Sequence, residues 1–170
     1  MFYFAVYRRT LIYVFLSLGL LLFVFTNRAQ AAGAFGNGKL MAQVGPYVMH
    51  WNNDTSHNAW SKLVGAEWEN PDRWEVGGAF FTNSFYQPCI YLYAGRRWFL
   101  PQVSDHLYVK LTAGPLYGYV GQYESKVPFN YHGLGLAILP ALGYQVERVS
   151  AQAVILGDAG IIFTFGYQIN

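Results

Sequence analysis

Two places in the chain carry side chains that could do chemistry together. His50 ends one alternating segment, and the pair Asn83-Ser84 ends a later one. A neutral histidine, with an ordinary pKa near ~6.5, can take a proton from a hydroxyl, and a serine can attack an ester or donate a hydrogen bond to its oxygen. This combination suits acyl transfer from an ester to a hydroxyl. Taken singly, a histidine at the end of a strand is commonly solvated, and an Asn-Ser pair is common in turns.

The first residues have the pattern of a secretory signal peptide. Arg8 and Arg9 precede an apolar run over 10–25, and Ala29-Gln30-Ala31 supplies a small-x-small cleavage site. We therefore expect cleavage after Ala31, with an uncleaved signal anchor as the alternative. Residues 32–170 then form a single domain.

The charge of the chain gives no indication of nucleic-acid binding. Three of the 11 Lys and Arg residues lie in the predicted signal peptide, which leaves 8 basic side chains against 9 Asp and Glu. The single cysteine, Cys89, cannot form an intramolecular disulfide, so we expect it to be a small apolar wall residue.

Composition separates two ways in which the chain could cross a membrane, as helices or as a β-barrel. Aromatic residues make up 19% of the chain and charged residues only 12%, with 18 glycines. Beyond residue 31 no run of 18 apolar residues occurs, which excludes membrane-spanning helices there. A membrane β-barrel remains, because its strands are short and alternate in polarity.

Alternation with a period of two predicts eight strands. They are expected near residues 39–51, 61–69, 74–83, 88–99, 107–120, 131–144, 149–156 and 160–168. In the last strand one face carries four large apolar side chains, which we expect to contact lipid: Ile161, Phe163, Phe165 and Tyr167. The fold class is therefore predicted to be all-β, an eight-stranded antiparallel transmembrane β-barrel of the bacterial outer membrane. A soluble lipocalin-like barrel would need the opposite pattern, apolar inside and polar outside.

The inward faces of these strands leave two readings open. Leu116, Val120 and Ile162 are expected to point inward, with room left beside them by three glycines, Gly114, Gly118 and Gly166. They could line an apolar cavity or simply fill the barrel. Lys110 is also expected to point inward, where it needs a partner or water.

The order of the strands predicts which distant residues meet. Turns at 70–73 and 147–148 are short, whereas the connections at 52–60 and 121–129 are longer and polar, as in outer-membrane barrels. Counting strands places His50 and Asn83-Ser84 on the same outer rim.

The other histidines are distributed over both ends of the predicted barrel. His132 is expected near the same rim, and His57 lies in the first outer loop beside Asp54, where both are expected to be solvated rather than to bind a metal. His106 is expected at the opposite, periplasmic end.

Three stretches of the chain resemble the PagP family. They are 45–51, 74–98 with its core 80–85, and 136–144. PagP is a lipid A palmitoyltransferase of the outer membrane, and its eight-stranded barrel uses a histidine and an Asp-Ser pair at the external rim. The resemblance covers most of the chain after the signal peptide, with sparse identities.

The resemblance implies roles for particular residues. His50 corresponds to the histidine, Ser84 to the serine and Asn83 to the aspartate, which is a departure. An amide can orient an imidazole but cannot stabilise an imidazolium as a carboxylate does, and the equivalent exchange in the serine-protease triad costs ~10⁴ in turnover. Pro46 and Pro140 resemble members of the proline pairs that admit lipid sideways, whereas the second members are absent.

The expected function follows from the site and the resemblance together. It is transfer of an acyl chain from a phospholipid to lipid A by a membrane-embedded monomer of the bacterial outer membrane. Phospholipid and lipid A are the expected partners, and no cofactor or metal is expected. The alternative is a catalytically silent outer-membrane barrel that binds lipid or another apolar small molecule. The chain ends in Asn170, without the terminal aromatic residue of many such barrels.

Overall fold

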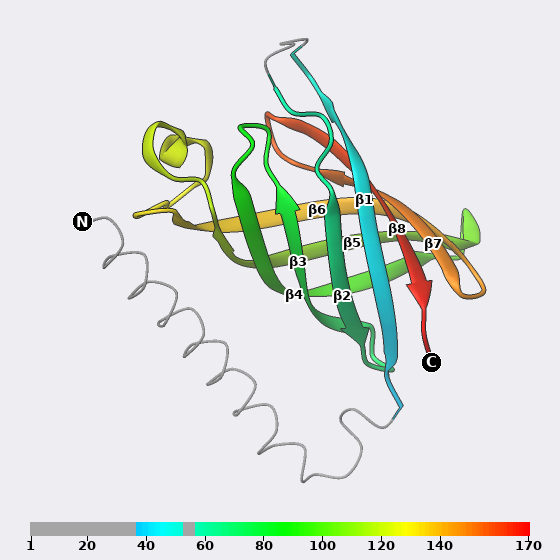
Figure 1. Cartoon of the computed structure of the whole chain (residues 1–170). Helices are drawn as coiled ribbons and strands as arrows, with labels where there is room; N and C mark the ends of the chain where they lie inside the picture. Colours follow the sequence, from blue (N-terminus) through cyan, green and yellow to red (C-terminus); the bar gives the residue numbers. More distant parts are fainter. Residues whose placement is uncertain (1–36, 53–56) are drawn as a thin grey trace, which may run out of the picture. The chain divides into compact units, whose positions relative to one another are not determined.

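The fold is a closed antiparallel β-barrel. The computed structural model describes residues 37–52 and 57–170, so the predicted signal peptide and Asp54 lie outside the described residues. Within this part each strand pairs with the next, and β8 pairs with β1 (Figure 1). The strands are β1 (Lys39–His50), β2 (Leu63–Glu69), β3 (Trp74–Thr82), β4 (Pro88–Leu100), β5 (Ser104–Tyr117), β6 (Leu134–Val146), β7 (Val149–Ile155) and β8 (Gly160–Gln168). The predicted eight-stranded barrel is confirmed, and residues 38–170 form one compact unit.

The connections differ between the two ends of the barrel. At the end where β1 begins, the β2–β3 turn is closed by Asn70, whose side-chain oxygen accepts the N–H of Trp74 at 2.9 Å, and only Glu147 and Arg148 separate β6 from β7. At the end where β1 finishes, the β5–β6 connection is long and contains a 3₁₀ helix, η1 (Gly121–Lys126). The predicted contrast between short turns and long loops is therefore present.

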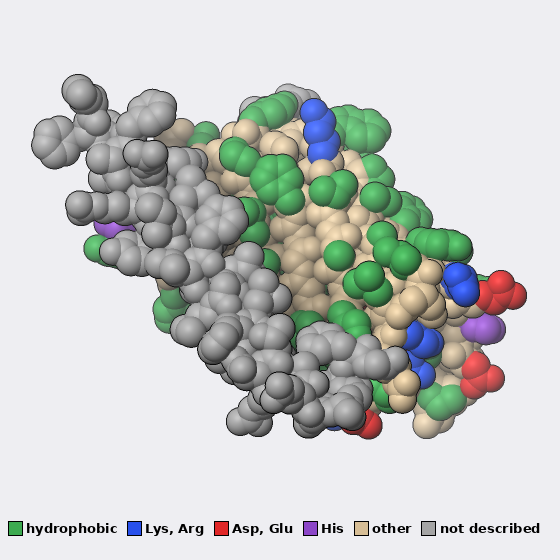
Figure 2. Space-filling model, turned by 60° about the horizontal axis from the view of Figure 1, so that its bottom comes forward, with side chains coloured by type: hydrophobic (Ala, Val, Ile, Leu, Met, Phe, Trp, Pro, Cys, Tyr) green, Lys and Arg blue, Asp and Glu red, His purple; other side chains and the backbone are tan. Residues whose placement is uncertain are grey.

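Alternation along the strands places apolar side chains on the outside. In β8 Ile162 and Thr164 are buried, whereas Phe163 and Phe165 are exposed on the exterior, as predicted. In Figure 2 hydrophobic side chains are spread over the visible barrel wall, and charged ones gather mainly at one end. This pattern is the reverse of that in a water-soluble lipocalin-like barrel. No helix in the described residues is long and apolar enough to cross a membrane.

Large aromatic side chains are exposed near both ends of the barrel. Trp74 and Trp98 lie at the end with the short turns, and Trp51 and Trp60 lie at the end with the long loops. Aromatic residues at both borders of an apolar band are typical of membrane barrels, because their rings favour the interface between lipid and water.

A cluster of ionic side chains fills the interior at the short-turn end. Arg97 reaches Glu75 at 2.7 Å, Glu67 at 3.2 Å and Glu69 at 3.3 Å. Lys110 pairs with Glu75 at 2.9 Å and also with Glu67. All five side chains are almost completely buried. Lys110 therefore points inward as predicted, and its partners are carboxylates rather than water.

The cluster is balanced in charge by one further residue. Arg73, in the β2–β3 turn, pairs with Glu69 at 2.8 Å, so three carboxylates face three cations. Buried charges are tolerated only when they are paired and hydrogen-bonded, and Tyr93 adds a hydrogen bond to Glu67 at 2.9 Å. The cluster ends the apolar interior on one side and leaves the other half of the barrel for a cavity.

Two prolines mark the places where strand pairing stops. The ladder between β1 and β2 ends at Gly45, next to Pro46, and the register of β1 on β8 shifts there. The ladder between β6 and β7 begins only at Ala141, next to Pro140. Because proline has no N–H to donate, the ladder is interrupted beside it. The first half of β6 therefore has no strand partner on its β7 side.

Candidate functional site

The structure brings His50 and Ser84 into direct contact. His50 is the last residue of β1, and Ser84 follows β3, which ends at Thr82. The Nε2 atom of His50 lies 2.7 Å from the Oγ of Ser84, and the two form a partly buried hydrogen bond. Their predicted proximity is confirmed. Because neighbouring strands are antiparallel, β1 and β3 run in the same direction and end at the same rim. A histidine and a serine at this distance form a possible base and nucleophile pair.

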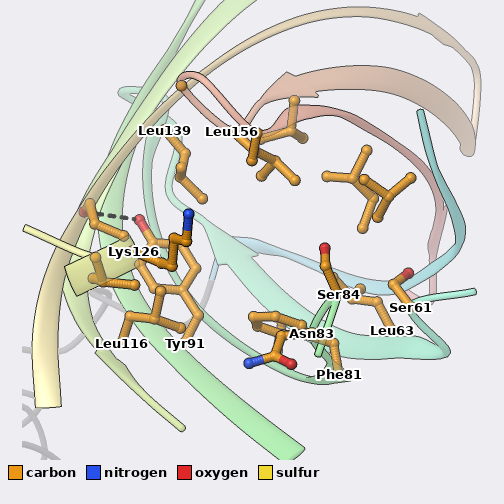
Figure 3. A pocket seen from close by; sticks show the side chains of 18 of the residues that line it. Ser61, Leu63, Phe81, Asn83, Ser84, Tyr91, Leu116, Lys126, Leu139 and Leu156 are labelled. Carbon is orange, nitrogen blue, oxygen red and sulfur yellow. Dashed lines mark hydrogen bonds between the residues drawn. The ribbon is translucent and has the colours of Figure 1, made fainter. Parts of the chain in front are cut away.

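Asn83 holds the loop that carries Ser84. Its side-chain oxygen accepts the N–H groups of Phe85 and Gln87, each at 2.9 Å, and its amide nitrogen donates to the Gln87 side chain at 3.2 Å. In Figure 3 the Ser84 hydroxyl and the Asn83 amide point in different directions. Ser84, rather than Asn83, is therefore the residue that contacts His50, and the contacts of Asn83 fix the β3–β4 loop.

His57 is a second histidine at this site. The centroid of its ring lies 5.3 Å from that of His50 and 5.3 Å from that of Phe85. The sequence pattern placed His57 only in the first outer loop, since the fold of a loop cannot be read from alternation. His132 instead contacts Tyr131, and His106 lies at the opposite end as predicted, where its Nδ1 is 3.0 Å from the Gln145 carbonyl.

His50 and Ser84 line a large cavity in the half of the barrel next to the long loops. Figure 3 shows Ser84 among the side chains that line it. The volume of the cavity is about 610 Å³. Most of the inner wall is apolar and includes Val48, Leu63, Ala79, Phe81, Leu116, Ala137, Leu139 and Ile162. Tyr93, Lys110 and Thr112 line its deep end, where the ionic cluster begins. The apolar cavity, one of the two readings of the sequence, is therefore present.

The cavity differs in detail from the sequence prediction. Leu116 and Ile162 line it as expected, whereas Val120 is replaced by Tyr119. The reason is that β5 ends at Tyr117 and Gly118 has φ +132°, which interrupts the alternation. Burial raises the pKa of Tyr119, so its hydroxyl stays protonated.

The inward glycines serve close packing rather than the cavity. A Cβ on Gly114 would lie 2.0 Å from the Leu92 carbonyl oxygen, and one on Gly166 would lie 2.5 Å from the Ser150 hydroxyl. None of the predicted three lines the cavity. Cys89 is completely buried and packs with Tyr91, as expected of a small wall residue.

Sequence reasoning identified only one member of the ionic cluster, Lys110. The signal for the carboxylates was present, because Glu67 and Glu69 alternate with Ala66 and Trp68 in β2 and so fall on the inward face. Within the described residues, no group of three or more His, Cys, Asp or Glu side chains is placed to hold a metal ion.

Comparison with known proteins gives a distant structural likeness. No protein-family model matches the chain, and no curated protein matches it. Among solved structures, the chain is similar to the outer membrane protein Ail of Yersinia pestis, determined in a phospholipid bilayer nanodisc. The identity is 14% and the TM-score 0.49, over 78% of this chain and all of that one.

Proposed function

We propose that this chain is a PagP-like acyltransferase of the bacterial outer membrane, which moves an acyl chain from a phospholipid to lipid A. The observation that carries the proposal is the 2.7 Å hydrogen bond between His50 and Ser84 at a cavity with apolar walls. Base and nucleophile chemistry is thus combined with space for a hydrocarbon chain. The cavity volume of about 610 Å³ lies within the range of ~300–1,000 Å³ found for small-molecule sites.

In this proposal His50 acts as the general base. It accepts the proton of the attacking hydroxyl, and the hydroxyl oxygen bonds to the ester carbonyl carbon. The ester C–O bond then breaks, and His50 passes the proton to the leaving oxygen, which releases the lysophospholipid. If the attacking group is Ser84, an acyl-enzyme forms first and the lipid A hydroxyl then takes the acyl group. If Ser84 instead donates to the ester oxygen, the lipid A hydroxyl attacks directly.

Membrane location is part of the same proposal. It is supported by the apolar exterior and by tryptophans at both ends of the barrel. Entry of lipid from the side is supported by the missing β6–β7 pairing above Pro140. Ile138, which is exposed on the outward face of β6, also lines the cavity, so the cavity reaches the barrel wall there.

A transfer assay tests the function. The purified protein is incubated with phospholipid and lipid A in detergent, and acyl addition to lipid A is followed by mass spectrometry. We expect transfer by the wild type and a loss of roughly 10²–10⁴ in His50→Asn. His132→Asn is the matched control, because His132 lies outside the cavity lining, and its rate should be unchanged.

The second candidate function is lipid binding without catalysis. It is favoured by the contacts of Asn83, which stands where the PagP family has an aspartate. The Asn83 side chain bonds within its own loop and supplies no carboxylate to His50. No transfer by the wild type, and none gained in Asn83→Asp, would support this candidate and contradict the enzyme.

A further inference from the structure

The short 3₁₀ helix η1 is held next to the loop that carries Ser84, and its last residue lines the cavity. Tyr123 of η1 stacks on Phe85 with ring centroids 3.8 Å apart and planes 10° apart. Phe85 directly follows Ser84 in the β3–β4 loop, and its ring also contacts Tyr119. This aromatic contact fixes η1, and its last residue Lys126, relative to the His50–Ser84 pair.

Lys126 is a cation that lines the cavity. In Figure 3 its ammonium group and the Ser84 hydroxyl are both directed into the same pocket. Lys110 also lines it, but Lys110 is paired with Glu67 and Glu75. Lys126 makes no ion pair with any residue in the described part of the chain, although Asp158 lines the same cavity. A cavity-lining lysine with no ion-pair partner among the described residues is well placed to bind an anionic ligand group.

We propose that Lys126 binds the phosphate of an amphiphile whose hydrocarbon chain occupies the cavity. This inference rests on the proposed function, in which the amphiphile is the phospholipid donor. An ammonium group offers three donors to phosphate oxygens, and an apolar wall favours the chain. Since Lys126 and Ser84 approach the cavity from different loops, a head group between them would bring its ester toward the serine.

The donor is the favoured source of the phosphate, although lipid A also carries phosphates. Lys126 lines the cavity that would receive the acyl chain, and the transferred chain enters this cavity as part of the donor. Binding should therefore require chain and phosphate in one molecule.

Binding of simple amphiphiles tests the proposal without catalysis. Decyl phosphate, decanol and inorganic phosphate are titrated calorimetrically into the purified protein in detergent micelles. We expect Lys126→Met to weaken decyl phosphate binding roughly tenfold and to leave decanol binding unchanged, because one charge-assisted hydrogen bond is lost. Lys126→Arg should retain most of the affinity.

Lys62→Met is the matched control for this experiment. Lys62 is exposed at the same end of the barrel but does not line the cavity. An equal loss in Lys62→Met, an equal loss for decanol, or no loss in Lys126→Met would overturn the proposal. Inorganic phosphate that binds as tightly as decyl phosphate, and in a Lys126-dependent way, would also overturn it.

The transfer assay separates this inference from the proposed function. With active protein, Lys126→Met should raise KM for the phospholipid about tenfold and leave KM for lipid A unchanged. An unchanged KM for phospholipid, or a raised KM for lipid A instead, would overturn the donor assignment while the acyltransferase stands. Weakened decyl phosphate binding without any acyl transfer would overturn the acyltransferase and support the phosphate site in a lipid-binding barrel.

Discussion

The Nε2 atom of His50 is hydrogen-bonded to the hydroxyl of Ser84, and this contact defines the chemistry that the rim can support. A hydroxyl 2.7 Å from an imidazole nitrogen can pass its proton to that nitrogen or hold the ring in place. Asn83 directly precedes Ser84, but its side-chain oxygen accepts hydrogen bonds from two N–H groups of the loop. The His50–Ser84 pair and Asn83, the residue that positions Ser84, are therefore distinct.

Ser84→Ala tests the contact itself. We expect the acyl-transfer rate to fall by about 10²-fold or more, because His50 loses the hydroxyl that it contacts. The rate is measured by mass spectrometry of lipid A, with Ser125→Ala, an exposed serine of η1, as the control. An undiminished rate in Ser84→Ala would remove the serine from the mechanism.

Asn83→Ala tests the positioning role. The change leaves the N–H groups of Phe85 and Gln87 without their acceptor, so we expect a loss of about 1–3 kcal/mol in the free energy of unfolding. Urea unfolding in detergent micelles measures it. Asn52→Ala, an exposed change on the same rim, should stay within about 0.5 kcal/mol of the wild type. Equal stability of the two variants would show that Asn83 does not hold the loop.

At the scale of the strands, alternation accounts for what could be predicted. A period of two gives the facing of Ile162, Phe163 and Lys110 without any knowledge of register, and strand parity gives the meeting of His50 and Ser84. The partners of Lys110 lie on β2 and β3, so they depend on how β2, β3 and β4 are aligned with β5, which side-chain type alone does not specify. The positions of His57 and Lys126 depend on loop conformation, where no periodicity operates.

The ionic cluster predicts strong coupling between strands. Lys110→Met leaves Glu67 and Glu75 short of a cation, and we expect about 3–5 kcal/mol of destabilisation in urea unfolding. Adding Glu75→Gln should recover part of this loss, because the unpaired carboxylate is removed. A double-mutant cycle with strictly additive effects would contradict the coupling.

At the scale of the whole molecule, the apolar exterior should determine insertion into lipid. Phe163 is exposed in the middle of β8, so Phe163→Arg would place a charge in the proposed bilayer. We expect a cost of about 2–4 kcal/mol in folding into phospholipid vesicles, followed by tryptophan fluorescence. The matched change Val103→Arg lies in the exposed β4–β5 turn and should cost little. Equal folding of both variants would contradict membrane embedding.

In the proposed membrane location, the paired charges inside the short-turn end also bear on permeability. Arg97, Lys110 and their carboxylates are bonded to one another and almost completely buried, so small solutes and ions find no open channel between them. In the proposed acyltransferase, a lipid that enters through the side of the barrel would therefore reach the cavity without opening the short-turn end.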